Sequence, residues 1–129
     1  MKLFRFLFIF LALGTSLQAQ KAEPTVTIVV PGINTTSVIK LDELLMIESF
    51  PASKEGYKIT GFTISYTDQG KTSESTSESN KLNEDNLIVL GRIRNAKVDP
   101  VKLTFSNIKA VNPKGKPVLL ANKTIKVKK

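Results

Sequence analysis

Apolar and polar residues alternate most regularly in the sequence YKITGFTISYT, residues 57–67. Successive side chains of an extended chain point to opposite faces, so Phe62, Ile64 and Tyr66 lie together on one face. Threonine and serine occupy the other face. The pattern predicts a strand with one apolar side and one hydroxyl-rich side.

The predicted strand runs into a turn and then into eight residues drawn only from Ser, Thr and Glu, residues 72–79. The sequence TDQG, residues 67–70, predicts a tight hairpin turn with a left-handed glycine. The Ser/Thr/Glu run predicts the returning edge strand, in which Glu74 and Glu78 keep the surface polar and discourage pairing with other molecules. A flexible loop is the alternative for this run.

Two segments have the spacing and charges of short helices. Residues 39–47 place leucines at helical spacing, and Asp42 and Glu43 suit the positive end of a helix. Asn83 can cap a second helix that ends near Asn95. The predicted buried stripe of this second helix is Leu87, Leu90 and Ile93.

The remaining segments predict further strands. A loose leader at residues 21–24 precedes a strand at residues 25–30. The segment 101–111 alternates and then resumes out of phase at Ile108, which predicts a bulge near Ser106 and Asn107. The sequence NPKG, residues 112–115, predicts a turn. In the last segment, 117–128, the apolar face is predicted to be Leu119, Ala121, Ile125 and Val127.

These elements predict an α+β, β-rich fold, with antiparallel hairpins forming a small sandwich or roll and one or two short helices. About 110 residues after export suffice for one hydrophobic core and not for two. We therefore expect residues 20–38, the leader and first strand, to belong to the same domain as residues 39–129.

The amino terminus has the three regions of a secretory signal peptide, with basic Lys2 and Arg5, an apolar run and a small polar exit. We expect cleavage after Ala19, so that residues 1–19 are removed and the exported protein begins at Gln20. The apolar run is shorter than a span of about 20 residues, so no membrane anchor is expected after cleavage. The absence of cysteine from an exported chain favours the bacterial periplasm, or secretion beyond it.

The chain contains neither histidine nor cysteine. Ser-His-Asp and Cys-His catalysis and His/Cys zinc sites are therefore excluded. The adjacent acids at the two helix starts are better explained by helix dipoles than as paired catalytic carboxylates. We predict that the protein is not an enzyme and that it needs no metal and no cofactor.

The formal charge of +8 falls to +6 on export, because the basic count drops from 19 to 17 while all 11 acids remain. Lysine is concentrated towards the C-terminus, and the predicted interaction face is Lys114, Lys116, Lys126 and Lys128. The edges of the sheet are the alternative, because their backbone hydrogen-bonding groups are left available. Export and the small number of aromatic residues argue against a nucleic-acid partner. A protein partner is expected instead.

The order of these motifs resembles the C-terminal domain of GldM, a protein of the gliding-motility and type IX secretion machinery of certain Gram-negative bacteria. The resemblance extends from Leu41 to Lys128, and its most specific pieces are Phe62–Tyr66, Ser79-Asn80, the sequence FSNIKA at residues 105–110, and Pro113-Lys114-Gly115. It implies the α+β fold, no catalytic residues and contact with other periplasmic proteins. In GldM this domain follows a transmembrane helix and further domains, whereas here we expect it to follow a signal peptide, so the motor role is not implied.

The sequence thus predicts a non-catalytic periplasmic protein-interaction module, accessory to a type IX secretion or gliding-motility assembly or independent of one. The alternative is a small secreted hydrolase or carbohydrate-binding domain whose site has no recognisable motif.

The exported protein is predicted to begin at Gln20, because Ala19 is the best cleavage residue after the apolar run. The intact mass of the protein recovered from a periplasmic extract measures this directly. Recovery of a chain that keeps residues 1–19 in the membrane fraction would contradict the expected cleavage and the soluble periplasmic placement.

Overall fold

The structure is a computed structural model that describes residues 21–33 and 36–129. The expected signal peptide and its cleavage point between Ala19 and Gln20 lie outside the described residues. The described part is 47% strand and 16% helix, which confirms the α+β, β-rich class. None of its helices is long and apolar enough to cross a membrane.

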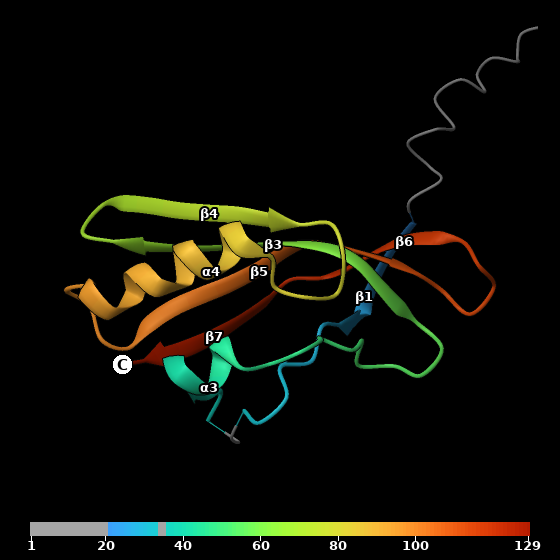
Figure 1. Cartoon of the computed structure of the whole chain (residues 1–129). Helices are drawn as coiled ribbons and strands as arrows, with labels where there is room; N and C mark the ends of the chain where they lie inside the picture. The colour runs from blue at the N-terminus through green and yellow to red at the C-terminus, as the bar shows by residue number, and fades with distance from the viewer. Residues whose placement is uncertain (1–20, 34–35) are drawn as a thin grey trace, which may run out of the picture.

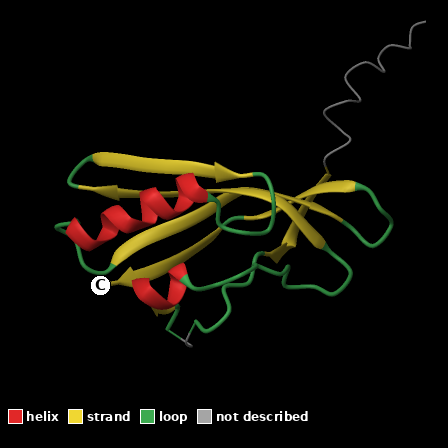
Figure 2. Ribbon diagram, viewed as in Figure 1, coloured by secondary structure: helices red, strands yellow, loops and turns green. Residues whose placement is uncertain are grey.

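The described strands form one seven-stranded mixed sheet (Figures 1 and 2). Its central strand is β5 (Val101–Val111), which is antiparallel to β3 (Lys58–Asp68). On its other side, β5 pairs with β7 (Lys123–Lys128) near its start and with β6 (Pro117–Ala121) near its end. The strand β5 therefore holds the two halves of the sheet together.

The predicted hairpin after β3 is confirmed. The strand β4 (Lys71–Ser77) pairs antiparallel with β3 and forms an edge of the described sheet. Gln69 and Gly70 connect the strands with φ values of 51° and 81°. Two left-handed residues between paired strands match the twist of a hairpin, which explains the glycine at this position. Residues 72–77 of the Ser/Thr/Glu run thus form a strand and not a flexible loop, whereas Glu78 and Ser79 lie beyond its end.

Two strands join the sheet by parallel pairing, which the sequence did not predict. The strand β1 (Lys21–Thr27) runs parallel to β6, and β2 (Val38–Lys40) runs parallel to β7. The segment 21–24 is therefore part of a strand and not a loose leader. Parallel partners lie far apart in sequence, so local periodicity carries no information about them.

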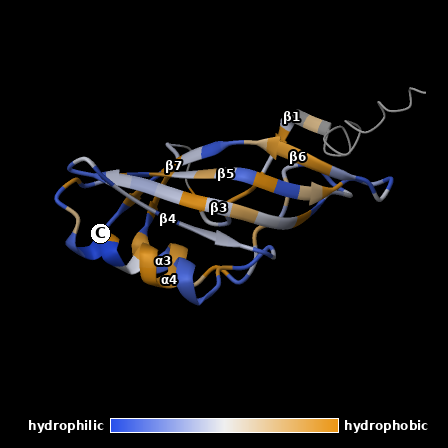
Figure 3. Cartoon of the chain, turned by 90° about the horizontal axis from the view of Figure 1, so that it is seen from above, coloured by the Kyte–Doolittle hydropathy of each residue, from blue (hydrophilic) through white to orange (hydrophobic). Residues whose placement is uncertain are grey.

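Two helices and a short 3₁₀ turn cover one side of the sheet, as Figure 3 shows for α3 and α4. The helix α3 (Leu41–Leu45) has Asp42 and Glu43 in its first turn, as expected. It is shorter than the predicted helix at residues 39–47, because residues 38–40 pair with β7 instead. The helix α4 (Glu84–Gly91) continues into the 3₁₀ turn η2 (Arg92–Asn95).

The predicted cap of α4 is confirmed, and it changes which face of the helix is buried. Asn83 Oδ1 accepts a hydrogen bond from the Asn86 backbone N–H, and Asn86 Oδ1 accepts one from the Asn83 N–H, both at 2.8 Å. Asn86 also donates to Ser75 Oγ on β4 at 2.6 Å. This buried asparagine turns Leu87 outward, so the predicted stripe is right for Leu90 and Ile93 and wrong for Leu87.

The predicted bulge in β5 is confirmed. Gly61 and Thr63 of β3 pair with Lys109 and Ser106 of β5, so one extra β5 residue lies between the pairs. Asn107, in this interval, has a φ of 47°. The bulge lets both halves of β5 bury their apolar residues against the same core.

The break between β6 and β7 at Asn122 shifts the alternation in the last segment as well. Val118 and Leu120 are buried on β6, where Leu119 and Ala121 were predicted to be. Ile125 and Val127 on β7 are buried, as predicted. The two strands pair with different halves of β5, on either side of the bulge. The buried positions of each strand therefore match the alternation of the half of β5 with which it pairs.

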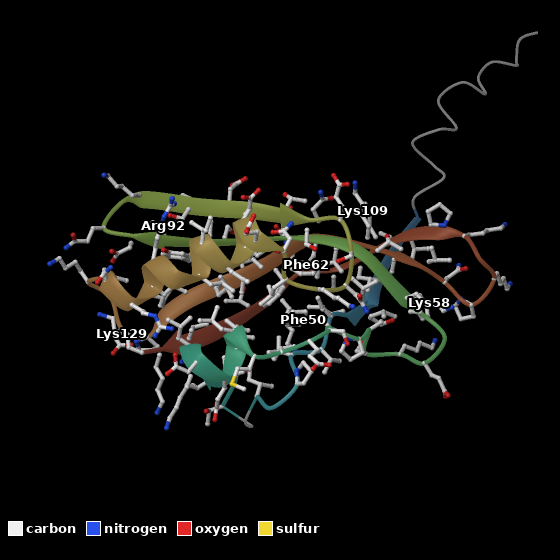
Figure 4. All side chains as sticks on the ribbon, viewed as in Figure 1. Phe50, Lys58, Phe62, Arg92, Lys109 and Lys129 are labelled. Carbon is white, nitrogen blue, oxygen red and sulfur yellow. The ribbon has the colours of Figure 1, made fainter. Side chains whose placement is uncertain are left out.

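Three phenylalanine rings form the centre of the core, and Figure 4 labels two of them, Phe50 and Phe62. The ring centroids of Phe50, Phe62 and Phe105 lie 5.6 to 5.7 Å apart. Tilted and edge-on contacts at this distance are the favoured geometry for aromatic pairs. The predicted core of Phe62, Ile64, Tyr66, Leu103, Phe105 and Ile125 is confirmed.

Phe105→Ala is predicted to lower the free energy of unfolding by about 3 to 5 kcal/mol, because it leaves a cavity among buried rings. Glu74→Ala, on the exposed side of β4, should change it by no more than about 0.5 kcal/mol. Urea denaturation of the two variants measures both values. A stable Phe105→Ala protein beside an unfolded Glu74→Ala protein would show that the two faces are assigned the wrong way round.

Candidate binding face on the open side of the sheet

The side of the sheet opposite the helices is polar, and we call it the open face. Ile64 and Phe105 pair across β3 and β5 and are both buried beneath the helices. Their neighbours Ser65 and Thr104 also pair, and they point to the other side, because side chains alternate along a strand. The apolar core thus fixes which residues form the open face.

Threonine hydroxyls link neighbouring strands across the open face. Thr63 and Thr76 join β3 to β4 at 2.9 Å between their Oγ1 atoms, and Thr67 and Thr72 do so at 2.8 Å. Thr104 and Thr124 join β5 to β7 at 3.2 Å. Such cross-strand pairs stabilise a sheet modestly and give this surface a hydroxyl-rich centre.

Four lysines gather at one end of the open face. Lys102 on β5 lies directly opposite Lys126 on β7, and Lys128 lies directly opposite Lys40 on β2. The three strands are neighbours, so these side chains form one cluster, and all four residues are exposed. We call this cluster the lysine face.

None of the four lysines of the lysine face forms an ion pair within the described residues. One ion pair is present there, between Arg94 and Asp42 at 3.0 Å, and it joins η2 to α3. Two nearby acids accept backbone hydrogen bonds instead. Asp68 accepts from the N–H groups of Lys97 and Val98 at 3.1 Å. Asp99 accepts from the N–H of Lys129 at 3.3 Å.

Like charges placed directly opposite each other destabilise a sheet. The Lys102–Lys126 pair therefore works against folding, and an anion bound between the two side chains would relieve the repulsion. Lysine ammonium groups beside threonine hydroxyls can hydrogen-bond carboxylate or other anionic groups.

The structure does not bring together the four lysines predicted from the sequence as one interaction face. Lys126 and Lys128 belong to the lysine face, whereas Lys114 and Lys116 lie at the turn between β5 and β6. The eleven residues of β5, at about 3.3 Å each, separate the two pairs by roughly 30 Å. Figure 1 shows the turn and the C-terminus at opposite ends of the molecule.

Sequence reasoning missed Lys40 and Lys102. Lys102 lies between two apolar residues of an alternating strand, so its outward direction was readable from the sequence. Its position opposite Lys126 was not, because that depends on the pairing of β5 with β7. Lys40 was assigned to a helix, which concealed its place beside Lys128.

A shallow cleft of about 390 Å³ adjoins the lysine face. Lys102 and the hydroxyl residues Ser65, Thr67 and Thr104 line it from the strands, while Val98 and Pro100 line it from the loop before β5. Two other hollows lie elsewhere. One of about 520 Å³ surrounds Met46 after α3, and one of about 240 Å³ lies at the bulge beside Lys109.

No group of three or more acidic, histidine or cysteine side chains that could hold a metal ion occurs in the described ranges, 21–33 and 36–129. The cleft beside the lysine face is lined by a cation, hydroxyls and a small apolar wall.

No protein-family model matches the chain, and no curated protein is significantly similar to it.

Proposed function

We propose that this protein is a non-catalytic binding module that holds an acidic protein partner against the lysine face. The observation that carries the proposal is the direct pairing of Lys102 with Lys126, neither of which forms an ion pair within the described residues. Natural proteins tend to break a stability rule where a function requires it. A partner carboxylate between these lysines would turn a repulsive pair into an attractive site.

The surroundings of the lysines favour a protein partner over a nucleic acid. Proteins that bind single strands combine cations with exposed aromatic rings on which bases stack. Here Thr104 and Thr124 lie between the lysine pairs and the rest of the open face, while Phe62 and Phe105 are buried in the core. The hydroxyls can hydrogen-bond a peptide backbone, and the lysines can pair with its acidic side chains.

The cellular setting of the proposal comes from the sequence. The signal-peptide pattern supports export to the periplasm, and the resemblance to the terminal domain of GldM supports a place beside a type IX secretion or gliding-motility assembly. In that setting the module would contact another component of the assembly and would not drive it.

Lys102→Glu combined with Lys126→Glu is predicted to weaken binding of fluorescent poly-glutamate by about tenfold or more at low salt. The two substitutions replace two positive charges with two negative ones and so lower the charge of one site by four units. Fluorescence anisotropy measures the affinity, and raising the salt concentration should weaken binding of the native protein more than that of the variant.

The matched control is Lys114→Glu combined with Lys116→Glu, which changes the net charge equally at the other end of the sheet. It should retain most of the affinity. Equal losses in the two double variants would mean that net charge alone attracts the polymer, and the lysine face would then not be the site.

A further inference from the structure

The loop that walls the cleft beside Lys102 is fixed from two sides. Asp68, at the end of β3, accepts the N–H groups of Lys97 and Val98 at 3.1 Å. Lys129 reaches the same loop from the C-terminus, where its Nζ donates to the carbonyl of Ala96 at 2.6 Å and its N–H to Asp99. The wall is therefore held in place before any ligand arrives, which lowers the entropic cost of binding.

Val98 gives this wall an apolar surface. Its side chain is 45% exposed, and Pro100 beside it is also exposed. A single exposed aliphatic residue is normal on a protein surface. Here, however, Val98 stands across a cleft from Lys102, which forms no ion pair within residues 21–33 and 36–129, and both side chains line the same hollow.

We propose that the partner inserts an acidic residue and a neighbouring aliphatic residue into this cleft. This inference rests on the function proposed above and names the peptide chemistry that the site selects. The carboxylate lies at Lys102 with Lys126 beside it, and the aliphatic side chain packs against Val98 and Pro100. The hydroxyls of Ser65, Thr67 and Thr104 then face the polar backbone of the segment.

The dimensions and lining of the cleft favour a peptide over a lipid. A hollow of about 390 Å³ falls at the small end of ligand sites and accommodates a few side chains. Two small apolar residues offer little surface to an acyl chain, and a floor of three hydroxyl residues would leave such a chain against polar groups. An extended peptide satisfies both parts of the lining.

Short synthetic peptides with alternating Glu and Leu, Glu and Ser, or Lys and Leu provide the test, with binding followed by fluorescence anisotropy. The native protein should prefer the Glu/Leu peptide. Val98→Ser should lower the affinity for the Glu/Leu peptide about fivefold, since an apolar contact is lost. It should leave the affinity for the Glu/Ser peptide unchanged. Lys102→Glu should lower the affinity for both acidic peptides.

Met46→Ser is the matched control, because Met46 is 81% exposed and lies at a different hollow. It should leave the affinities for all three peptides unchanged. Thermal unfolding of each variant, followed by circular dichroism, verifies that the fold is intact, as expected for substitutions of exposed side chains.

The outcomes separate this inference from the proposed function. Loss of binding in Lys102→Glu without any effect of Val98→Ser on the Glu/Leu peptide would overturn the inference and leave the lysine face as the site. Unchanged binding in Lys102→Glu would overturn both. Tighter binding to phosphatidylglycerol vesicles than to the Glu/Leu peptide, with the same dependence on Val98, would overturn the proposed peptide partner in favour of a lipid surface.

Discussion

The packing of Phe105 against Phe50 and Phe62 determines the polarity of the whole sheet. With Phe105 buried, alternation along β5 places Lys102 and Thr104 on the opposite side, where β7 contributes Lys126 and Thr124. A shift of the β5 pairing by one residue would turn these lysines into the core. The surface that we propose as the binding site is thus a consequence of the aromatic core.

The energies of the two faces explain why the fold tolerates the lysine face. Removing a buried phenylalanine ring costs about 3 to 5 kcal/mol. A like-charge pair across a sheet costs at most about 1 kcal/mol, and less when both side chains reach water. The stability of the core therefore exceeds the cost of the repulsion between Lys102 and Lys126, which remains in the folded protein at the site that we propose for an anionic partner. The loop that carries Val98 is anchored by the hydrogen bond from the Val98 backbone N–H to Asp68, so the valine side chain is free to stay at the surface.

Sequence reasoning succeeded where structure depends on neighbours along the chain. The alternation of β3, the hairpin at Gly70 and the phase change near Asn107 all reflect local backbone geometry, and each was predicted correctly. It failed where distant segments meet. The parallel strands β1 and β2 and the alignment of β5 with β7 depend on long-range pairing, so the sequence suggested a cluster of C-terminal lysines that the fold divides. The outward turn of Leu87 depends on a buried side-chain hydrogen bond between Asn86 and Ser75, which no hydrophobic pattern reveals.

An amide chemical-shift titration of the isotopically labelled protein with poly-glutamate tests the central claim most directly, since it locates the bound anion on the sheet. The account predicts the largest shifts at Lys102, Thr104 and Lys126, with little change at the turn that carries Lys114 and Lys116. The largest shifts at that turn, or on the helical side around Arg94, would contradict it.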